Sequence, residues 1–536
     1  MVAHSKDGIR ARIMETARGD DIIEHSETSP LLRSNSTEGH NRKPVSRHAL
    51  FRTPNAILLV MLAVVVLTSF GDQLGEVPLN RIYESVICYK YYETNDPSKI
   101  KLPRSALGPG AIGGVDELWC KKADEVQNDL AMLNGLLLFL NGIPGLLLAV
   151  PFGWAADRYG RWPFIMLNLF QIAAKLVWSQ FVAWQWQIFD VRVMWAQSLF
   201  CLLGGGSPVI SALFFVAIQD VVPEKDRASA FLRLGAANLS ASLLMPPLAA
   251  LLMRKSPWIP SIMGTVMFIL AMLLYLLVPE TLHYGKEEAD STQAEPDLAG
   301  STPGPPDLAP TNPPISANVI VVYSDKFKAT MAFLTRDYRV PLLILPFVAH
   351  ILIAEIASLL LQYVSKRYSM TFSAATILIT IRNGVTVLLL VVILPYLSTL
   401  AMTRFGLSSQ RKDLYLARIS QIFVAVGWLA LAASPNIPVA GISLAISSLG
   451  QGAALLMRSF LSTIVPANEI ARTYSVIAIV DTLGIMFGSP LLALLFEKGI
   501  GLPFVALGLS SALFAVLLFI VKVRKGEDEI MSDSSS

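Results

Sequence analysis

Residues 130–162 read LAMLNGLLLFLNGIPGLLLAVPFGWAADRYGRW. Residues 130–150 contain no charged side chain, and about 20 apolar residues in a helix cross the roughly 30 Å hydrocarbon core of a bilayer. The remainder is a glycine-containing turn that carries Asp157, Arg158 and Arg161. The stretch therefore predicts one membrane span followed by a short charged loop.

The composition of the whole chain extends this prediction. Of the 536 residues, 53% are hydrophobic and only 15% are charged, which is too apolar for an ordinary soluble domain. In hydrocarbon only helices and closed barrels satisfy their own backbone hydrogen bonds. The apolar runs have helical length rather than the short alternating pattern of barrel strands. The net charge of +3, with no dense basic run, excludes nucleic acid as an expected partner.

Twelve apolar runs are long enough to span a bilayer, so we predict an all-α polytopic membrane protein whose helices form two bundles of six. Charged short loops fall on the side that also holds both termini, and cytosolic loops are enriched in Lys and Arg. We therefore expect both termini to be cytosolic. The predicted spans are 56–74, 130–150, 164–183, 194–218, 228–253, 259–278, 341–364, 374–397, 414–433, 439–464, 474–496 and 504–523.

A proline-rich segment divides the chain into halves. It lies between the sixth and seventh spans, and its small polar composition predicts a disordered linker. The predicted organisation is a cytosolic disordered tail at 1–54, a six-helix bundle at 55–282, the cytosolic linker at 283–338, a second six-helix bundle at 339–523 and a cytosolic tail at 524–536.

The two halves share a faint internal repeat. Residues 203–206 (LGGG) precede a Val-Pro turn at 222–223, and residues 449–452 (LGQG) precede a Val-Pro turn at 465–466. Parallel repeats of this kind build transporters whose substrate lies between the halves near the bilayer midplane. The repeat therefore supports a transporter with two related bundles.

The loop after the second span resembles the loop signature of the major facilitator superfamily, in which Gly and Asp-Arg are followed by Gly-Arg and a basic residue. Trp162 stands in place of that basic residue. The resemblance implies the twelve-helix major facilitator fold and a cytosolic gate whose contacts with the eleventh span favour an outward-open state. A plain basic loop is the alternative interpretation. The gate residues that the resemblance implies are Gly153, Asp157, Arg158, Gly160, Arg161, Asp220, Glu224 and Arg227.

The end of the first span resembles a fungal group of facilitators associated with export of secondary metabolites and drugs. The residues that carry this resemblance are 71–84, GDQLGEVPLNRIYE, continuing to Cys88. It implies export of a small organic compound.

Ionisable residues within spans are costly, so each is a candidate for substrate or proton translocation. Asp72 and Glu76 lie one helical turn apart and are the candidate proton-binding carboxylates. Similar depths on neighbouring helices suggest two pairs, one between Glu355 and Arg382 and the other between Arg458 and Asp481. Structural ion pairs are the alternative for each. The candidate translocation residues are Asp72, Glu76, Arg81, Lys175, Glu355, Arg382, Arg458 and Asp481.

Two further features lie outside the spans. Cys88 and Cys120 both fall in the predicted first external loop, so we expect a disulfide, with two free thiols as the alternative. Residues 27–32 resemble an acidic dileucine sorting signal through Glu27, Leu31 and Leu32. That signal implies sorting adaptors and a vacuolar or endosomal membrane, as an alternative to the plasma membrane.

The function predicted from these observations is proton-coupled efflux of a small organic compound by alternating access. The alternative is proton-coupled uptake of a nutrient or organic anion, and a membrane-embedded enzyme or a non-transporting receptor is a less favoured interpretation. No nucleotide-binding loop or metal-ligand cluster is present in the sequence, so we expect no enzyme activity, no metal and no cofactor beyond a proton gradient. We expect the protein to work as a monomer.

Overall fold

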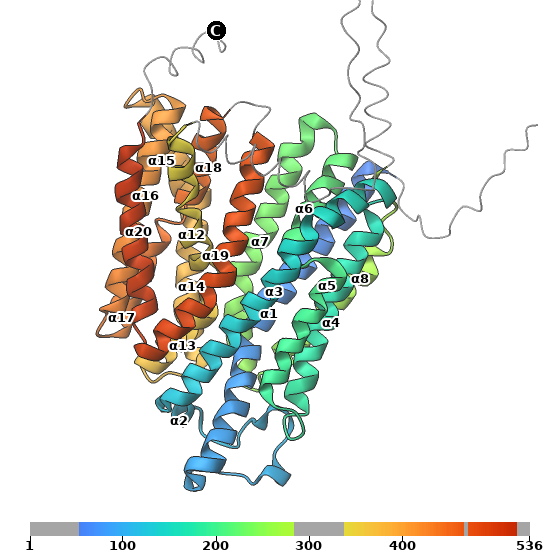
Figure 1. The fold of residues 1–536 in the computed structure, drawn as a ribbon, viewed down its shortest axis with the longest axis vertical. Helices are drawn as coiled ribbons and strands as arrows, with labels where there is room; N and C mark the ends of the chain where they lie inside the picture. Colours follow the sequence, from blue (N-terminus) through green and yellow to red (C-terminus); the bar gives the residue numbers. More distant parts are fainter. Residues whose placement is uncertain (1–52, 283–336, 466–469, 523–536) are drawn as a thin grey trace, which may run out of the picture. The chain divides into compact units, whose positions relative to one another are not determined.

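The computed structural model describes residues 53–282, 337–465 and 470–522, which all belong to one unit, residues 48–536 (Figure 1). The predicted tails, most of the linker and the sorting residues Glu27, Leu31 and Leu32 lie outside the described residues. Within the described ranges the secondary structure is helical and includes no strand. The predicted all-α fold is confirmed.

The helices of the first half follow the predicted spans in order. The fourth span is divided into η4, α5 and α6, and α2 is a short helix before the second span. The elements are α1 (Pro54–Asn95), α2 (Glu117–Lys122), α3 (Asp124–Tyr159), α4 (Trp162–Trp184), η4 (Val191–Leu199), α5 (Cys201–Gly204), α6 (Gly206–Val221), α7 (Glu224–Met253) and α8 (Trp258–Tyr275).

The second half contains more interruptions than the first. Of the described helices, eleven are long and apolar enough to cross a membrane, and the bent pair 339–355 and 357–367 makes a twelfth if it is one span. The elements are α11 (Arg339–Ile344), α12 (Phe347–Glu355), α13 (Ala357–Arg367), α14 (Phe372–Leu388), the π-helical turn η5 (Leu389–Ile393), α15 (Leu394–Thr403), α16 (Ser409–Ala432), α17 (Ile437–Ser448), α18 (Ala453–Ile464), α19 (Ile470–Lys498) and α20 (Leu502–Ile520).

Helix α1 is much longer than the first predicted span. Its 42 residues, at 1.5 Å per residue, extend about 63 Å, roughly twice the hydrocarbon thickness. Thr53 caps its N-terminus by accepting a hydrogen bond from the backbone of Ala56. Cys88 therefore lies in the projecting part of a helix, and the prediction that it lies in a loop was wrong.

The internal repeat marks a helix break in both halves. At Gly205 the backbone has φ +79°, which ends α5 before α6 begins. Asn168 of α4 donates to the carbonyl oxygens of Gly204 and Gly206 at this break, so the carbonyl groups freed by the break keep partners in a region without water. In the second half, residues 449–452 separate α17 from α18. The two glycine-containing segments thus have the same structural role.

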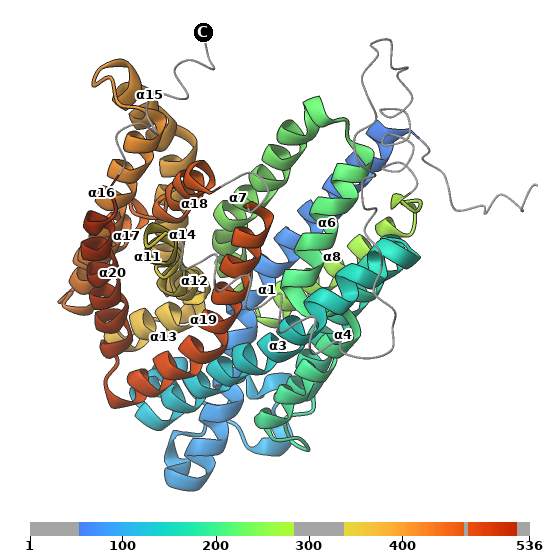
Figure 2. The same ribbon diagram turned by 45° about the horizontal axis from the view of Figure 1, so that its top comes forward.

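Two helix pairs join the halves. Helix α3 packs along α19, and α7 packs along α14; both pairs lie side by side in the views of Figures 1 and 2. Gly135 allows the first contact, because a Cβ atom at this position would already lie 3.1 Å from the carbonyl oxygen of Ser489. Small residues at such crossings let membrane helices approach closely.

The crossing of α1 and α8 tests this packing. A Cβ added at Gly71 would lie 2.7 Å from the carbonyl oxygen of Gly264, whereas a Cβ at Gly75 would have nothing within 4 Å. We expect Gly71→Ala to lower the free energy of unfolding by about 1–3 kcal/mol through overpacking. The thermal unfolding midpoint of the purified protein is the measurement, with Gly75→Ala as the matched control. Equal midpoints for the two variants would contradict this account.

Candidate functional site

Five charged side chains from four membrane-spanning helices interact electrostatically with one another. They are Asp72 and Glu76 of α1, Lys175 of α4, Glu355 at the end of α12 and Arg382 of α14. Electrostatic interactions link Asp72 with Lys175, Glu355 with both of these, and Glu76 with Asp72, Glu355 and Arg382. We call these five residues the central charged group. It combines side chains from both halves of the chain.

The five side chains differ in how accessible they are. Asp72 and Glu355 are exposed, Glu76 and Lys175 are half-buried, and Arg382 is buried. Because Asp72 and Glu355 interact electrostatically with charged groups on other helices, they face the interior of the bundle. No ion pair joins any of the five to another residue in the part of the chain that the structure describes. Charges of this kind require water or a ligand as their partner.

The predicted pairing of Glu355 with Arg382 is not formed. Instead, Arg382 donates from a terminal guanidinium nitrogen to the carbonyl oxygen of Ile353, at 2.9 Å. The seventh span bends by 57° between α12 and α13, and such a break leaves carbonyl groups without their partners in the helix. Arg382 supplies one of these partners, so its charge is held at the bend and Glu355 stays unpaired.

The second predicted pair is present but lies apart from the central charged group. Arg458 of α18 and Asp481 of α19 form an ion pair of 3.2 Å. The guanidinium group of Arg458 also lies 5.0 Å from the ring centre of Phe347. Both helices belong to the second half, so this pair connects spans within one bundle.

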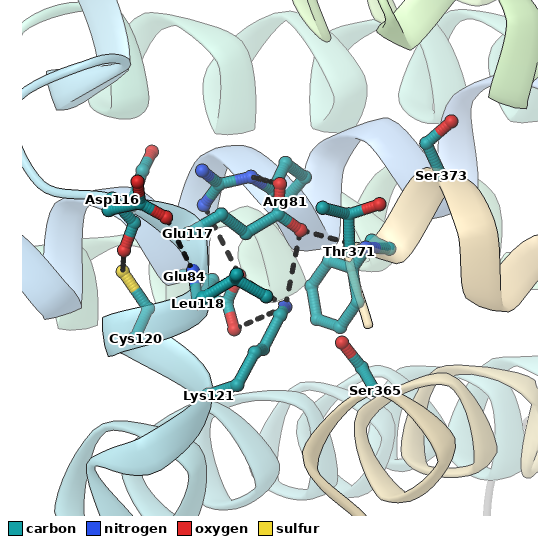
Figure 3. Close-up of polar contacts among 12 residues, drawn as sticks. Arg81, Glu84, Asp116, Glu117, Leu118, Cys120, Lys121, Ser365, Thr371 and Ser373 are labelled. Atoms are coloured by element: carbon teal, nitrogen blue, oxygen red, sulfur yellow. Dashed lines mark hydrogen bonds and ion pairs between the residues drawn. The ribbon is translucent and has the colours of Figure 1, made fainter. Parts of the chain in front are cut away.

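A second cluster of charges lies where α1 projects beyond the central group, and Figure 3 shows it. Lys121 lies 2.6 Å from both carboxylate oxygens of Glu84, and these side chains are 1% and 0% exposed. Arg81 contacts Glu84 at 3.2 Å and Glu117 at 3.1 Å. We call Arg81, Glu84, Glu117 and Lys121 the α2 network. Arg81, predicted as a translocation residue, belongs to it.

The α2 network joins the two halves. Glu117 accepts a hydrogen bond of 2.7 Å from the backbone N–H of Phe372, the first residue of α14, where the helix dipole favours a negative charge. Lys121 lies 3.0 Å from the centre of the Phe372 ring. Nearby, Lys366 of α13 forms an ion pair of 2.7 Å with Asp124 of α3. This end of the molecule is therefore closed by contacts between the halves.

A disulfide between Cys88 of α1 and Cys120 of α2 holds the network in place. Lys121 follows Cys120 directly, so the bond keeps its side chain beside Glu84. Asp116 caps α2 by accepting hydrogen bonds from the backbone N–H of Leu118 and from Lys101, each 3.0 Å. These hydrogen bonds hold the pKa of the Asp116 carboxyl below its ordinary value. The remaining cysteine, Cys201, is buried and free.

The signature loop forms a network at the other end of α3. Arg161 contacts Asp157 and lies 2.8 Å from Asp220. Glu280 accepts hydrogen bonds from the backbone N–H groups of Arg161 (2.7 Å) and Trp162 (3.1 Å). These contacts tie together the ends of the second, fourth and sixth spans of the first half.

Other residues of the predicted gate have different positions. Gly160 has φ +108°, and a side chain there would clash with Glu280. Trp162, which replaces the expected basic residue, stacks on Tyr275 with ring centres 6.5 Å apart. Arg158 lies against the rings of Trp154 and Tyr159.

The rest of the predicted gate is placed as follows. Gly153 lies in α3, and a Cβ atom there would have open space. Arg227 donates to the carbonyl oxygen of Val222 at 3.1 Å. The side chain of Glu224 and residues 466–469, just before the eleventh span, lie outside what the structure describes. The predicted contact of the loop with that span therefore stays a prediction.

Sequence reasoning missed the part played by Glu117, Lys121 and Glu280. The sequence signal for Glu84 is its spacing, because Asp72, Glu76, Asn80 and Glu84 recur every four residues and form one polar stripe along a helix. The one local signal for Lys121 is its position beside a cysteine that pairs with α1. Its burial depends on how α2 folds back on α1, which no local pattern shows.

A sequence model of the Major Facilitator Superfamily matches residues 124–488. The MFS efflux pump atnC of Emericella nidulans is 30% identical over 475 residues, covering 86% of this chain and 87% of that protein. The efflux pump ustT of Aspergillus flavus is 28% identical over 473 residues, covering 88% and 87%. The crystal structure of a D-xylose-proton symporter superposes with a TM-score of 0.54 at 15% identity, covering 87% and 97%.

The α2 network makes a prediction about stability. Lys121→Met leaves Glu84 buried without its nearest partner, so we expect the free energy of unfolding to fall by about 3 kcal/mol. The double variant Glu84→Gln with Lys121→Met removes both charges and should recover part of that loss. Thermal unfolding midpoints of the purified protein measure both effects. The control is Lys122→Met, at an exposed neighbouring position, and a similar loss there would argue against the network.

Proposed function

Since this chain belongs to the Major Facilitator Superfamily and is a multi-pass membrane transporter, not an enzyme, we propose that it exports a small organic compound in exchange for protons. One observation carries the proposal. The central charged group brings carboxylates from both halves, without an ion-pair partner among the described residues, close enough to interact electrostatically. The relatives named as efflux pumps, which align over most of this chain, support export as the direction.

The central charged group gives a physical route for proton coupling. Asp72 and Glu76 lie in the first half, whereas Glu355 and Arg382 lie in the second. Protonation of a carboxylate removes one charge from this group, and so changes the attraction between the halves. Because carboxylates in such a site exchange protons with the water that enters it, the proton and the substrate both alter which conformation is favoured.

The orientation in the membrane follows from the two ends of α3. Disulfides persist in oxidising surroundings, so we place the end with Cys88, Cys120 and the α2 network outside the cell. The signature loop with Arg158 and Arg161 then faces the cytosol, in agreement with the positive-inside rule. Both termini are cytosolic in this arrangement. The contacts across the α2 network correspond to a state closed to the outside.

The remaining parts of the proposal concern cofactors, assembly and location. The proton gradient is the energy source, without a bound cofactor, and the protein functions as a monomer. We place it in the plasma membrane, with a vacuolar or endosomal membrane and sorting adaptors as the alternative.

Uptake of an organic anion is the second candidate function. Lys175 and Arg382 both belong to the central charged group and provide two positive charges within it. An anionic substrate could pair with them, whereas a neutral or cationic one would interact with the carboxylates. The direction of transport separates the two candidates.

Everted membrane vesicles with an acidic interior test the export of substrate in exchange for protons. The probe is a labelled compound chosen by comparing the metabolites released from cells with and without the protein. A gradient of one pH unit supplies about 1.4 kcal/mol per proton, which is about a tenfold accumulation. Asp72→Asn or Glu76→Gln should reduce the ratio to about one, because these variants cannot release a proton.

The control is Glu93→Gln, which changes a surface carboxylate paired with Arg104 far from the central group. This variant should accumulate the probe as well as the unmodified protein does. Accumulation only in right-side-out vesicles with an acidic exterior would establish uptake and reject export. Full accumulation by both Asp72→Asn and Glu76→Gln would reject the assigned role of these two carboxylates.

A further inference from the structure

A small cavity lies between α3, α12–α13 and α19, next to the central charged group. Its volume is about 30 Å³, and a cavity of about 10–15 Å³ is enough for one water molecule. Five polar residues line it: Asn134, Glu355, Ser358, Gln362 and Ser489. Glu355 belongs both to this lining and to the central charged group, so the cavity adjoins the space through which a substrate would pass.

Gln362 is the unusual member of this lining. Its side chain is 0% exposed, and neither its amide nitrogen nor its amide oxygen has a hydrogen-bond partner in the structure. Buried polar groups almost always have partners, because leaving one unpaired is unfavourable. Asn134, in contrast, donates to Asn80 at 2.6 Å. The lining of the cavity therefore includes one side chain, Gln362, whose amide N–H donors and carbonyl acceptor are both unused.

The chemistry of the lining restricts the occupant. The amide of Gln362 is satisfied by a group that both donates and accepts hydrogen bonds. A carboxylate or phosphate would be repelled by Glu355 and could not donate to the oxygen of Gln362. An ammonium group would leave the NH₂ group of Gln362 unpaired. An uncharged amide or hydroxyl group has neither defect.

We propose that this cavity is a subsite that binds an uncharged amide or hydroxyl group of the transported compound, with Gln362 as its main hydrogen-bonding residue. The inference rests on the proposed function, since it names a feature of the exported molecule. Glu355 and Gln362 lie two helical turns apart, on either side of the bend between α12 and α13, and both line this cavity. Without a bound group the buried amide of Gln362 is unpaired, which is unfavourable. A bound group that completes its hydrogen bonds removes this penalty, and that gain favours binding.

Benzamide and acetophenone are suitable probes, because they share a shape and differ by an NH₂ group in place of a CH₃ group. Thermal unfolding of the purified full-length protein, at increasing probe concentrations, gives an apparent affinity for each. We expect benzamide to bind the unmodified protein about tenfold more tightly than acetophenone, from the hydrogen bonds that only the amide completes. Gln362→Leu should bind the two probes with equal affinity.

A second readout separates binding from structural support. Without probe, Gln362→Leu should unfold at the same temperature as the unmodified protein or higher, because it removes an unpaired polar group. The matched control is Gln421→Leu. Gln421 is also 0% exposed, but it contacts His350 at 2.8 Å and donates to the carbonyl oxygen of Ser511 at 3.3 Å. That variant should unfold at a lower temperature.

Three results would overturn the subsite. The first is equal affinity of the unmodified protein for the two probes, which would mean that water alone fills the cavity. The second is a preference for benzamide that survives in Gln362→Leu. The third is a loss of stability in Gln362→Leu as large as that in Gln421→Leu. None of these measurements depends on transport. If proton-driven export fails but the preference for benzamide is observed, the proposed function is rejected and the subsite stands. If export is observed but the preference for benzamide is absent, only the subsite is rejected.

Discussion

The structure depends on one constraint, which is that hydrocarbon offers no hydrogen bonds to a polar group. At two of the span breaks, a side chain from a neighbouring helix hydrogen-bonds the carbonyl groups that the break leaves without partners. Asn168 does so at Gly204 and Gly206, and Arg382 does so at Ile353. At these two breaks a polar side chain from another helix compensates for the interrupted backbone hydrogen bonds.

The same constraint separates structural charges from those available for transport. In the α2 network every charge is paired, and Glu84 and Lys121 are almost completely buried. In the central charged group the carboxylates of Asp72 and Glu355 are exposed to an interior space and unpaired within the described residues. Paired charges stabilise one arrangement of the halves, whereas unpaired ones respond to a proton or a ligand.

Helix α1 connects these two regions. Its polar stripe begins with Asp72 and Glu76 in the central charged group, continues through Asn80, which accepts from Asn134, and ends at Glu84 in the α2 network. A rotation or tilt of α1 would therefore act on both regions together. Helix α1 thereby provides a continuous physical link between the central charged group and the α2 end.

The sequence by itself determined the helical membrane fold and the order of the spans, because apolar length acts locally along the chain, whereas the breaks at the two glycine-containing segments emerged only in the structure. The sequence also predicted that Arg458 and Asp481 lie at matching depth in the membrane, because each residue of a helix advances by a fixed distance. Only the tertiary structure decided that Arg382 binds a carbonyl instead of Glu355 and that Gln362 lacks a partner. These outcomes depend on the bend of the seventh span and on how each helix is turned towards its neighbours, which no stretch of sequence specifies alone.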